Sequence, residues 1–165
     1  MAQTRQRPMR GWELTLERFA ASRAGGWYFI NVANKIDKHL VPATRGKLST
    51  AVGQQVLVVE TIGAKSGQAR RIPLVYVSEG DAIVLIASKG GAPKHPAWYH
   101  NLKAHPEVQV WAKGRSGRYR AREAEGEERE RLWAKAVDYY AGYDTYQART
   151  GGRRIPVMVL EPVSG

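Results

Sequence analysis

The stretch that decides the fold is residues 54–88, QQVLVVETIGAKSGQARRIPLVYVSEGDAIVLIAS. It is rich in Val, Ile and Leu and is divided by glycine-containing turns, which is typical of short strands joined by tight connections. We predict strands at 54–61, 72–78 and 81–88, the last two joined by a tight turn at 79–80. Strands this close in sequence pair antiparallel, because a parallel pair needs a long crossover connection.

The chain beyond this stretch continues the mixed pattern. The sequence predicts a short helix at 95–104, half-buried strands at 107–113 and 118–124, a helix at 125–140 and a last strand at 155–160. The count of about six short strands with flanking helices predicts a mainly β (α+β) fold. In this fold an antiparallel sheet curls into a small barrel.

The N-terminal quarter differs from this domain. Residues 1–10 are expected to form a basic flexible tail, residues 11–41 an N-terminal helical segment that ends before Pro42, and residues 42–165 the barrel domain. The helical stripes of 11–41 carry large aromatic residues on the apolar face and basic residues opposite. This pattern suits helices packed on their own domain, a lid, or helices lying on an anionic membrane.

Composition narrows the classes of function. The chain has 26 basic and 15 acidic residues, a net charge of +11, which favours an anionic partner: nucleic acid, lipid, or a phosphorylated polycarboxylate ligand. The absence of cysteine excludes disulfides, thiolate zinc sites and a cysteine nucleophile. No apolar run is long enough to cross a bilayer or to form a signal peptide. We therefore expect a cytoplasmic protein that can also lie on the inner face of the cell membrane.

Two glycine-containing stretches follow strands and can bind a ligand. In 61–73 a turn bracketed by glycines presents backbone N–H groups, with Lys65, Arg70 and Arg71 able to bind a phosphate or carboxylates. An ordinary basic hairpin turn explains the same residues equally well. In 87–92 two adjacent glycines let a flat ligand approach the backbone closely, although the same letters also occur in plain loops.

Two aromatic stretches offer further contacts. Trp98 and Asn101 lie one helical turn apart and can hold a heteroaromatic ring by stacking and hydrogen bonding. The histidines near them lack a carboxylate or cysteine at ligand spacing, so we expect no metal site. Four tyrosines lie between 139 and 146. They can pack against the last strand or line a pocket, where a hydroxyl orients a carbonyl.

Taken together, these stretches resemble the deazaflavin (coenzyme F420)-dependent nitroreductase family of split β-barrel oxidoreductases. The resemblance covers about two thirds of the chain, from Val56 to Pro162. It rests on four motifs in order: T-x-G-x-K-S-G-Q-x-R from Thr61, A-S-K-G-G at 87–91, P-x-W-Y-x-N-L-K-A-x-P at 96–106, and R-x-I-P at 153–156.

The resemblance implies where coenzyme F420, an 8-hydroxy-5-deazaflavin with a phosphodiester and an oligoglutamate tail, would bind. The first motif would hold the tail, the strand after it and the A-S-K-G-G segment would line the ring, and the tryptophan–asparagine helix would close over it. The implied coenzyme-binding residues are Lys65, Ser66, Arg70, Arg71, Ile72, Pro73, Leu74, Val75, Ile86, Ala87, Ser88, Lys89, Ala97, Trp98 and Asn101.

The resemblance also implies the reaction. Reduced coenzyme F420 would transfer a hydride to an electrophilic carbon of an enone, quinone or nitro-aromatic acceptor. Ser88 and Tyr143 would be the catalytic residues, donating hydrogen bonds to the developing negative charge, and Tyr143 and Tyr146 would contact the substrate. Two positions depart from the family pattern: Ala64 replaces an arginine, for which Arg71 or Arg45 could substitute, and Val75 replaces a tyrosine.

Three alternatives stay open. The same fold also hosts FMN-binding reductases, because fold does not determine the cofactor. A non-enzymatic binder of a lipid or of nucleic acid is a second class, although the motifs favour a small-molecule acceptor and no nucleic acid. A membrane-bound location is the third. We expect a monomer, with the N-terminal helices covering surface that smaller split barrels bury by dimerising.

Overall fold

The computed structural model describes residues 34–50 and 54–163. The strands are β1 (Val56–Ile62), β2 (Ala69–Val75), β3 (Val77–Glu79), β4 (Ala82–Ile86), β5 (Glu107–Trp111), β6 (Gly117–Glu123) and β7 (Val157–Pro162). The helices are α3 (Asn34–Ala43), the single 3-10 turn η2 (Lys89–Gly91), α4 (Ala97–Ala104), α5 (Gly126–Tyr139) and α6 (Gly142–Arg149). Residues 1–33, which hold the predicted tail and most of the predicted helical segment, lie outside the described ranges.

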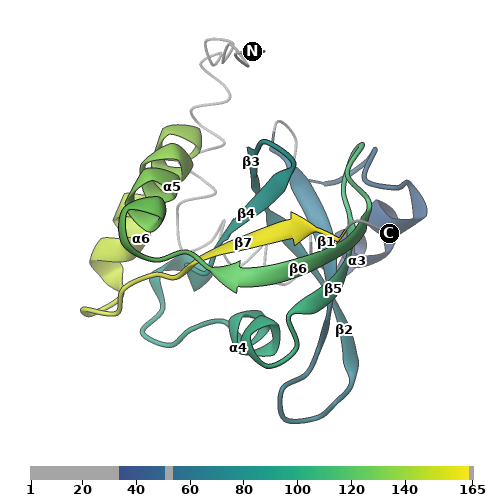
Figure 1. Cartoon of the computed structure of the whole chain (residues 1–165), viewed down its shortest axis with the longest axis horizontal. Helices are drawn as coiled ribbons and strands as arrows, with labels where there is room; N and C mark the ends of the chain where they lie inside the picture. The colour runs from purple at the N-terminus through teal and green to yellow at the C-terminus, as the bar shows by residue number, and fades with distance from the viewer. Residues whose placement is uncertain (1–33, 51–53, 164–165) are drawn as a thin grey trace.

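All seven strands form one antiparallel sheet, in the order β2-β1-β5-β6-β7-β4-β3 (Figure 1). The two edge strands, β2 and β3, are separated in sequence by Tyr76 alone. The sheet must therefore curl until its two edges approach each other, and the backbone N–H of Tyr76 donates to Gln55 O at 3.1 Å where they do. The predicted antiparallel split barrel is confirmed.

The prediction of a single strand at 72–78 was wrong, because this stretch contains the end of β2 and most of β3. Residues up to Val75 pair with β1, and residues from Val77 pair with β4 at the other edge of the sheet. The apolar pattern runs through Tyr76 without a break, so local sequence gives no sign that the partner changes there. Residues 34–50 and 54–163 consequently contain seven strands, where about six were predicted.

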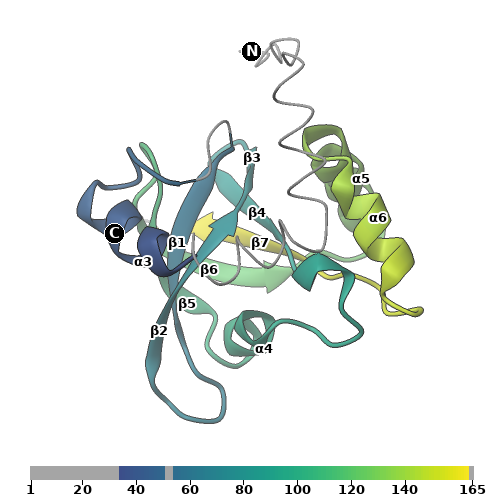
Figure 2. The same ribbon diagram turned by 180° about the vertical axis from the view of Figure 1, so that it is seen from behind.

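Side chains alternate between two hydrophobic clusters, as the period of a strand requires. On β4, Ile83 and Leu85 belong to the inner cluster, which also receives Trp98 and Leu102 from α4. Val84 on the same strand belongs to the outer cluster, which packs under α5 and α6. Figure 2 shows α5 and α6 together on one flank of the barrel, with α4 below it and α3 on the opposite side.

Two helical predictions need correction. The helix expected to end before Pro42 includes this proline, and α3 ends at Ala43. The helix α3 packs on β1 and β2 and is therefore part of the barrel unit. The helix α6, which carries Tyr143 and Tyr146, was not predicted, because its few apolar residues make no clear helical stripe.

Candidate functional site

The β1–β2 turn carries the first motif. The backbone N–H of Gly63 donates to Gln68 O at 2.9 Å, and that of Gly67 donates to Gly63 O at 2.8 Å. A Cβ at Gly63 would contact the Ser66 hydroxyl, so a larger residue there would have to displace the Ser66 side chain. The side chains of Lys65 and Ser66 are exposed. The turn is thus a firmly bonded backbone that presents its polar side chains to solvent.

Asn101 holds this turn from behind. Its side chain is 5% exposed. The amide oxygen accepts from Ala64 N–H at 3.0 Å, and the amide nitrogen donates to Thr61 Oγ1 at 3.0 Å. Both polar ends of the amide are therefore used inside the protein. A positioning role for Asn101 follows from these bonds, and direct contact with the coenzyme remains a prediction.

Trp98 lies on the same helix and points into the barrel. It is 7% exposed and belongs to the inner cluster, while Ala97 beside it is exposed. The indole therefore packs inside the barrel, beneath the surface that Ile72 and Leu74 form. Stacking of the indole on the coenzyme ring stays a prediction.

The residues of β2 divide between two faces. Ile72 and Leu74 are partly buried against the inner cluster. Arg71 faces the other way, since its Nε donates to Glu60 Oε2 at 2.9 Å and its guanidinium lies 4.8 Å from the centre of the Trp111 ring. Successive residues of a strand alternate in direction, so Pro73 and Val75 lie on the side of Arg71. A ligand on one face of β2 can therefore contact only about half of residues 71–75, all of which were predicted to bind the coenzyme.

The A-S-K-G-G loop is clamped by Arg153. The guanidinium donates to the carbonyl oxygens of Ala87 at 3.2 Å, Ser88 at 2.9 Å and Ala92, the last from both Nε at 3.0 Å and Nη2 at 2.8 Å. A single side chain thus fixes the path of the backbone on both sides of η2. In the sequence, Arg153 stands out only as the first residue of the R-x-I-P motif. Its function as a clamp was missed, because its acceptors are backbone atoms some 60 residues away in sequence.

Arg153 also favours the neutral form of His95, which lies two residues before the start of α4. Nη1 of Arg153 lies 3.0 Å from His95 Nδ1. A guanidinium can only donate, so Nδ1 accepts and the ring is neutral. Burial and then the charge of Arg153 lower the pKa of His95, in agreement with this geometry. The loop and the helix that carries Asn101 are therefore joined through one arginine.

The helix α6 packs directly on the loop. Gly91 has a φ of +81°, and a Cβ there would lie 2.7 Å from Tyr146 O. Glycine therefore allows the contact that brings Ser88 and Lys89 close to the tyrosine-bearing helix. Within the loop Ser88 is buried, Lys89 is exposed, and Ile86 at the end of β4 packs in the outer cluster.

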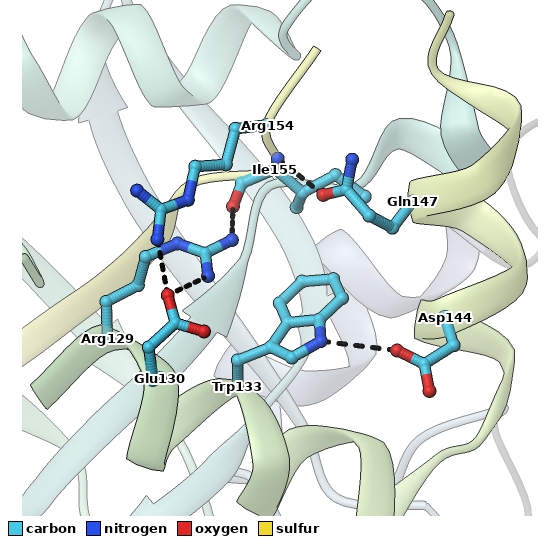
Figure 3. Close-up of polar contacts among 7 residues, drawn as sticks. All are labelled: Arg129, Glu130, Trp133, Asp144, Gln147, Arg154 and Ile155. Carbon is cyan, nitrogen blue, oxygen red and sulfur yellow. Dashed lines mark hydrogen bonds and ion pairs between the residues drawn. The ribbon is translucent and has the colours of Figure 1, made fainter. Parts of the chain in front are cut away.

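Figure 3 shows how α6 is fixed. Trp133 Nε1 donates to Asp144 Oδ1 at 3.2 Å, which joins α5 to α6. Gln147 Oε1 accepts from Ile155 N–H at 2.9 Å, and its amide nitrogen donates to Arg153 O at 2.7 Å. The segment that carries the clamping arginine is therefore bonded to the tyrosine helix.

Tyr143 is the buried member of the tyrosine group. It is 6% exposed and packs edge-on against Tyr140, whose hydroxyl lies 3.2 Å from that of Tyr146. Burial raises the pKa of Tyr143 far above its ordinary value, with smaller contributions from neighbouring tyrosines. The hydroxyl is therefore protonated over the whole physiological range. It can donate a hydrogen bond but is a poor acid.

The four motifs thus form one connected arrangement. Asn101 binds the β1–β2 turn, Arg153 binds the loop and His95, and α6 packs on the loop. An exposed basic turn next to the partly buried Ile72 and Leu74 suits a ligand with an anionic tail and a flat ring. The described residues contain no group of His, Asp or Glu that could hold a metal ion. None of the described helices is long and apolar enough to cross a membrane.

Comparison with known proteins identifies the family. A family model described as F420H(2)-dependent quinone reductase matches residues 33–162. An F420H(2)-dependent quinone reductase of Mycobacterium tuberculosis H37Rv is 41% identical over 107 residues, 63% of this chain and 71% of that protein. A solved structure of an F420-H2 dependent reductase is 47% identical with a TM-score of 0.57, covering 64% of this chain and 93% of that chain. A second structure, of a domain-swapped dimer, is 41% identical with a TM-score of 0.63, covering 77% and 94%. The chain belongs to the F420H(2)-dependent quinone reductase family.

Proposed function

We propose that this protein reduces a quinone with electrons from reduced coenzyme F420. The observation that supports the proposal is the connection of the motif-bearing segments through Asn101 and Arg153, in a chain of this family. When bound, the reduced deazaflavin supplies a hydride. The protein supplies binding, orientation and hydrogen bonds.

The exposed basic turn is proposed to hold the anionic tail. Lys65 and Arg70 are exposed, and neither makes an ion pair with another described residue. Their charges are thus available to phosphate and carboxylate groups, with Ser66 as a further donor. Arg71 is bonded to Glu60 on the opposite face and is a poor replacement for the family's missing arginine at Ala64.

The apolar part of the coenzyme is proposed to lie over Ile72 and Leu74, against the loop 87–92. Trp98 supports this side from inside the barrel. Ser88 would orient the ring or the acceptor, and Tyr143 would donate a hydrogen bond to the negative charge that develops on the acceptor oxygen. Tyr146, on the same helix, would contact the acceptor.

Quinones are the acceptor class we favour, and enones and nitro-aromatic compounds are proposed as further acceptors. Each presents an electrophilic carbon or nitrogen next to an oxygen that takes up negative charge. A single donor such as the Tyr143 hydroxyl would serve all of them. Discrimination among them would depend on the shape of the acceptor side, which Tyr143 and Tyr146 are proposed to line, whereas Val75 faces the other side of β2.

The monomeric state is proposed and is to be tested by light scattering. The structure described as a domain-swapped dimer shows that a 41% identical chain can exchange segments. The proposed cytoplasmic location and attachment to the inner membrane face rest on the charge and on the helical stripes of 11–41. Truncation before Asn34 should abolish binding to anionic vesicles if those stripes carry it, and unchanged binding would contradict this part.

The function is tested by mixing the protein with reduced coenzyme F420 and a soluble quinone and following the return of deazaflavin absorbance. We expect saturable, protein-dependent oxidation of the coenzyme. Reduced FMN run in parallel should bind weakly and support no turnover. Turnover with FMN alone would be compatible with the split-barrel fold but would overturn the assignment of coenzyme F420 as the cofactor. Absence of turnover with either would overturn the enzymatic proposal.

A further inference from the structure

A second basic site lies at the end of the barrel opposite the coenzyme turn. A hollow of about 440 Å³ is lined by Arg45, Lys47, Lys113, Gly114 and Ser116. This volume is within the range of ~300–1,000 Å³ usual for small-molecule sites. Strand β5 runs antiparallel to β1, with Val58 opposite Trp111 and Glu60 opposite Gln109. The β5–β6 turn is consequently at the start of β1, and the turn with Lys65 is at its end.

Tertiary structure brings these cations together from two separate segments. A side chain at Gly46 would collide with the backbone of Ala112 and Lys113, so the segment after α3 packs directly on the β5–β6 turn. None of the ion pairs found among residues 34–50 and 54–163 includes Arg45, Lys47 or Lys113. Like charges gathered in this way repel each other, a cost that a bound anion would remove.

Both segments are held firmly before any ligand arrives. Thr44 Oγ1 donates to Leu40 O at 2.8 Å and accepts from Leu48 N–H at 3.2 Å. In the facing turn, Ser116 Oγ donates to Ala112 O at 3.0 Å and accepts from Ala112 N–H at 3.2 Å. The hydroxyl of Ser116 is thus used to build the turn, and the binding groups are the three cations.

Arg45 has an unusual backbone conformation. Its φ is +51°, in the left-handed region, two residues after Ala43, the last residue of α3. Glycine is the common residue at this position of a helix end, because other residues pay a steric cost there. The helix end holds Arg45 in this conformation, because Arg45 N–H donates to Pro42 O at 3.2 Å and Gly46 N–H donates to Val41 O at 2.8 Å, and this fixes the arginine next to the β5–β6 turn.

We propose that this hollow binds a phosphate group, with Arg45 as the bidentate donor and Lys47 and Lys113 as supporting charges. A guanidinium matches the spacing of two phosphate oxygens, and ammonium groups add charge without directional demands. The phosphate belongs either to a lipid headgroup or to a soluble phosphorylated compound. The site is separate from the coenzyme site and does not depend on the proposed reductase activity.

The test is a titration of the full chain with pyrophosphate, followed by amide NMR shifts of Gly46 and Gly114. We expect saturable shifts at both glycines, and affinity about tenfold lower in the double variant Arg45→Asn/Lys113→Gln. Asparagine tolerates the left-handed conformation, so this variant should fold. The matched control Arg120→Gln/Lys135→Gln removes the same charge elsewhere and should bind like the wild type. Absence of shifts, or equal loss in the control, would overturn the proposal.

Sedimentation with vesicles distinguishes the sources. Vesicles of phosphatidylcholine mixed with phosphatidylglycerol should bind the wild type and the control more strongly than the double variant if the ligand is a lipid headgroup, and the binding that the double variant keeps is then assigned to residues 11–41. Equal vesicle binding by all three proteins, with pyrophosphate affinity lost only in the double variant, would assign a soluble phosphorylated ligand.

A further variant tests the backbone of Arg45. Arg45→Gly should raise the unfolding temperature while it weakens pyrophosphate binding. A lower unfolding temperature would contradict the proposed strain. Arg45 lies at the start of β1, away from the β1–β2 turn, so it does not replace the arginine missing at Ala64, and coenzyme F420 binding should be unchanged in every variant.

Discussion

The β1–β2 turn and the loop 87–92 are both glycine-rich segments that follow a strand, yet the structure holds them differently. The turn is exposed and is tied to the barrel by the amide of Asn101. In the loop, Ser88 is buried, and the backbone carbonyl groups of Ala87, Ser88 and Ala92 accept hydrogen bonds from the Arg153 guanidinium. A charged, flexible tail requires accessible cations, whereas a flat ring requires a fixed surface. We propose that the turn meets the first requirement and the loop the second.

Removal of the Arg153 clamp should have the largest effect. Arg153→Gln removes the side-chain donors of Ala87 O and Ala92 O, while Ser88 O keeps the N–H of Gly91. We expect a loss of about 3 kcal/mol in the free energy of unfolding together with weaker coenzyme binding. Arg153→Lys keeps the positive charge but lacks the planar guanidinium with its several donors, so it should recover little of the lost stability or coenzyme affinity. Chemical denaturation and coenzyme titration measure both quantities. The neighbouring Arg154→Gln is the control, because among the residues that the structure describes Arg154 makes an exposed ion pair with Glu130 and no other.

Asn101→Ala should affect the exposed turn alone. The variant leaves the Thr61 hydroxyl and the Ala64 N–H without partners, at a cost of about 1–2 kcal/mol in stability. We expect coenzyme affinity to fall while the turnover number at saturation stays near that of the wild type. A drop in the turnover number at saturating coenzyme would show that Asn101 acts on the ring, and would break the proposed division between tail and ring segments.

Tyr143→Phe tests the loop side without disturbing packing. The ring is kept and only the hydroxyl is lost, so we expect unchanged coenzyme affinity and turnover lower by roughly tenfold or more. Because burial raises the pKa of Tyr143, wild-type turnover should show no loss attributable to this hydroxyl up to about pH 10. Tyr119→Phe, in the inner cluster, should reduce stability but not turnover. Equal turnover of Tyr143→Phe and wild type would remove the hydroxyl from the reaction.

The smallest expected effect concerns His95. Its pKa is lowered in the folded protein, so below about pH 6.5 the unfolded chain binds a proton that the folded state resists. Stability should therefore fall as the pH drops through this range. The fall should be steeper in the wild type than in His95→Gln, as measured by urea unfolding at several pH values. Parallel curves for the two proteins would mean that folding does not lower the pKa of His95.

The sequence allowed prediction of the parts that local pattern controls. Strands such as β5 alternate visibly, and the acidic start of α5 marks a helix N-terminus. The change of partner at Tyr76 and the clamp by Arg153 depend on tertiary contacts and leave no local trace. The stretch 71–75 was predicted as one lining surface because motif matching ignores alternation. The structure assigns Ile72 and Leu74 to one face and Arg71 to the other.

The most direct test of the account compares coenzyme F420 with the same deazaflavin lacking the phosphate and glutamate tail. Binding of both is measured by fluorescence titration in the wild type, in Lys65→Gln/Arg70→Gln and in Arg153→Lys. The account predicts that the double variant loses affinity for the complete coenzyme only, in a salt-dependent way, and that Arg153→Lys loses affinity for both compounds. Equal loss of both compounds in the double variant would contradict the assignment of the turn to the tail and the loop to the ring.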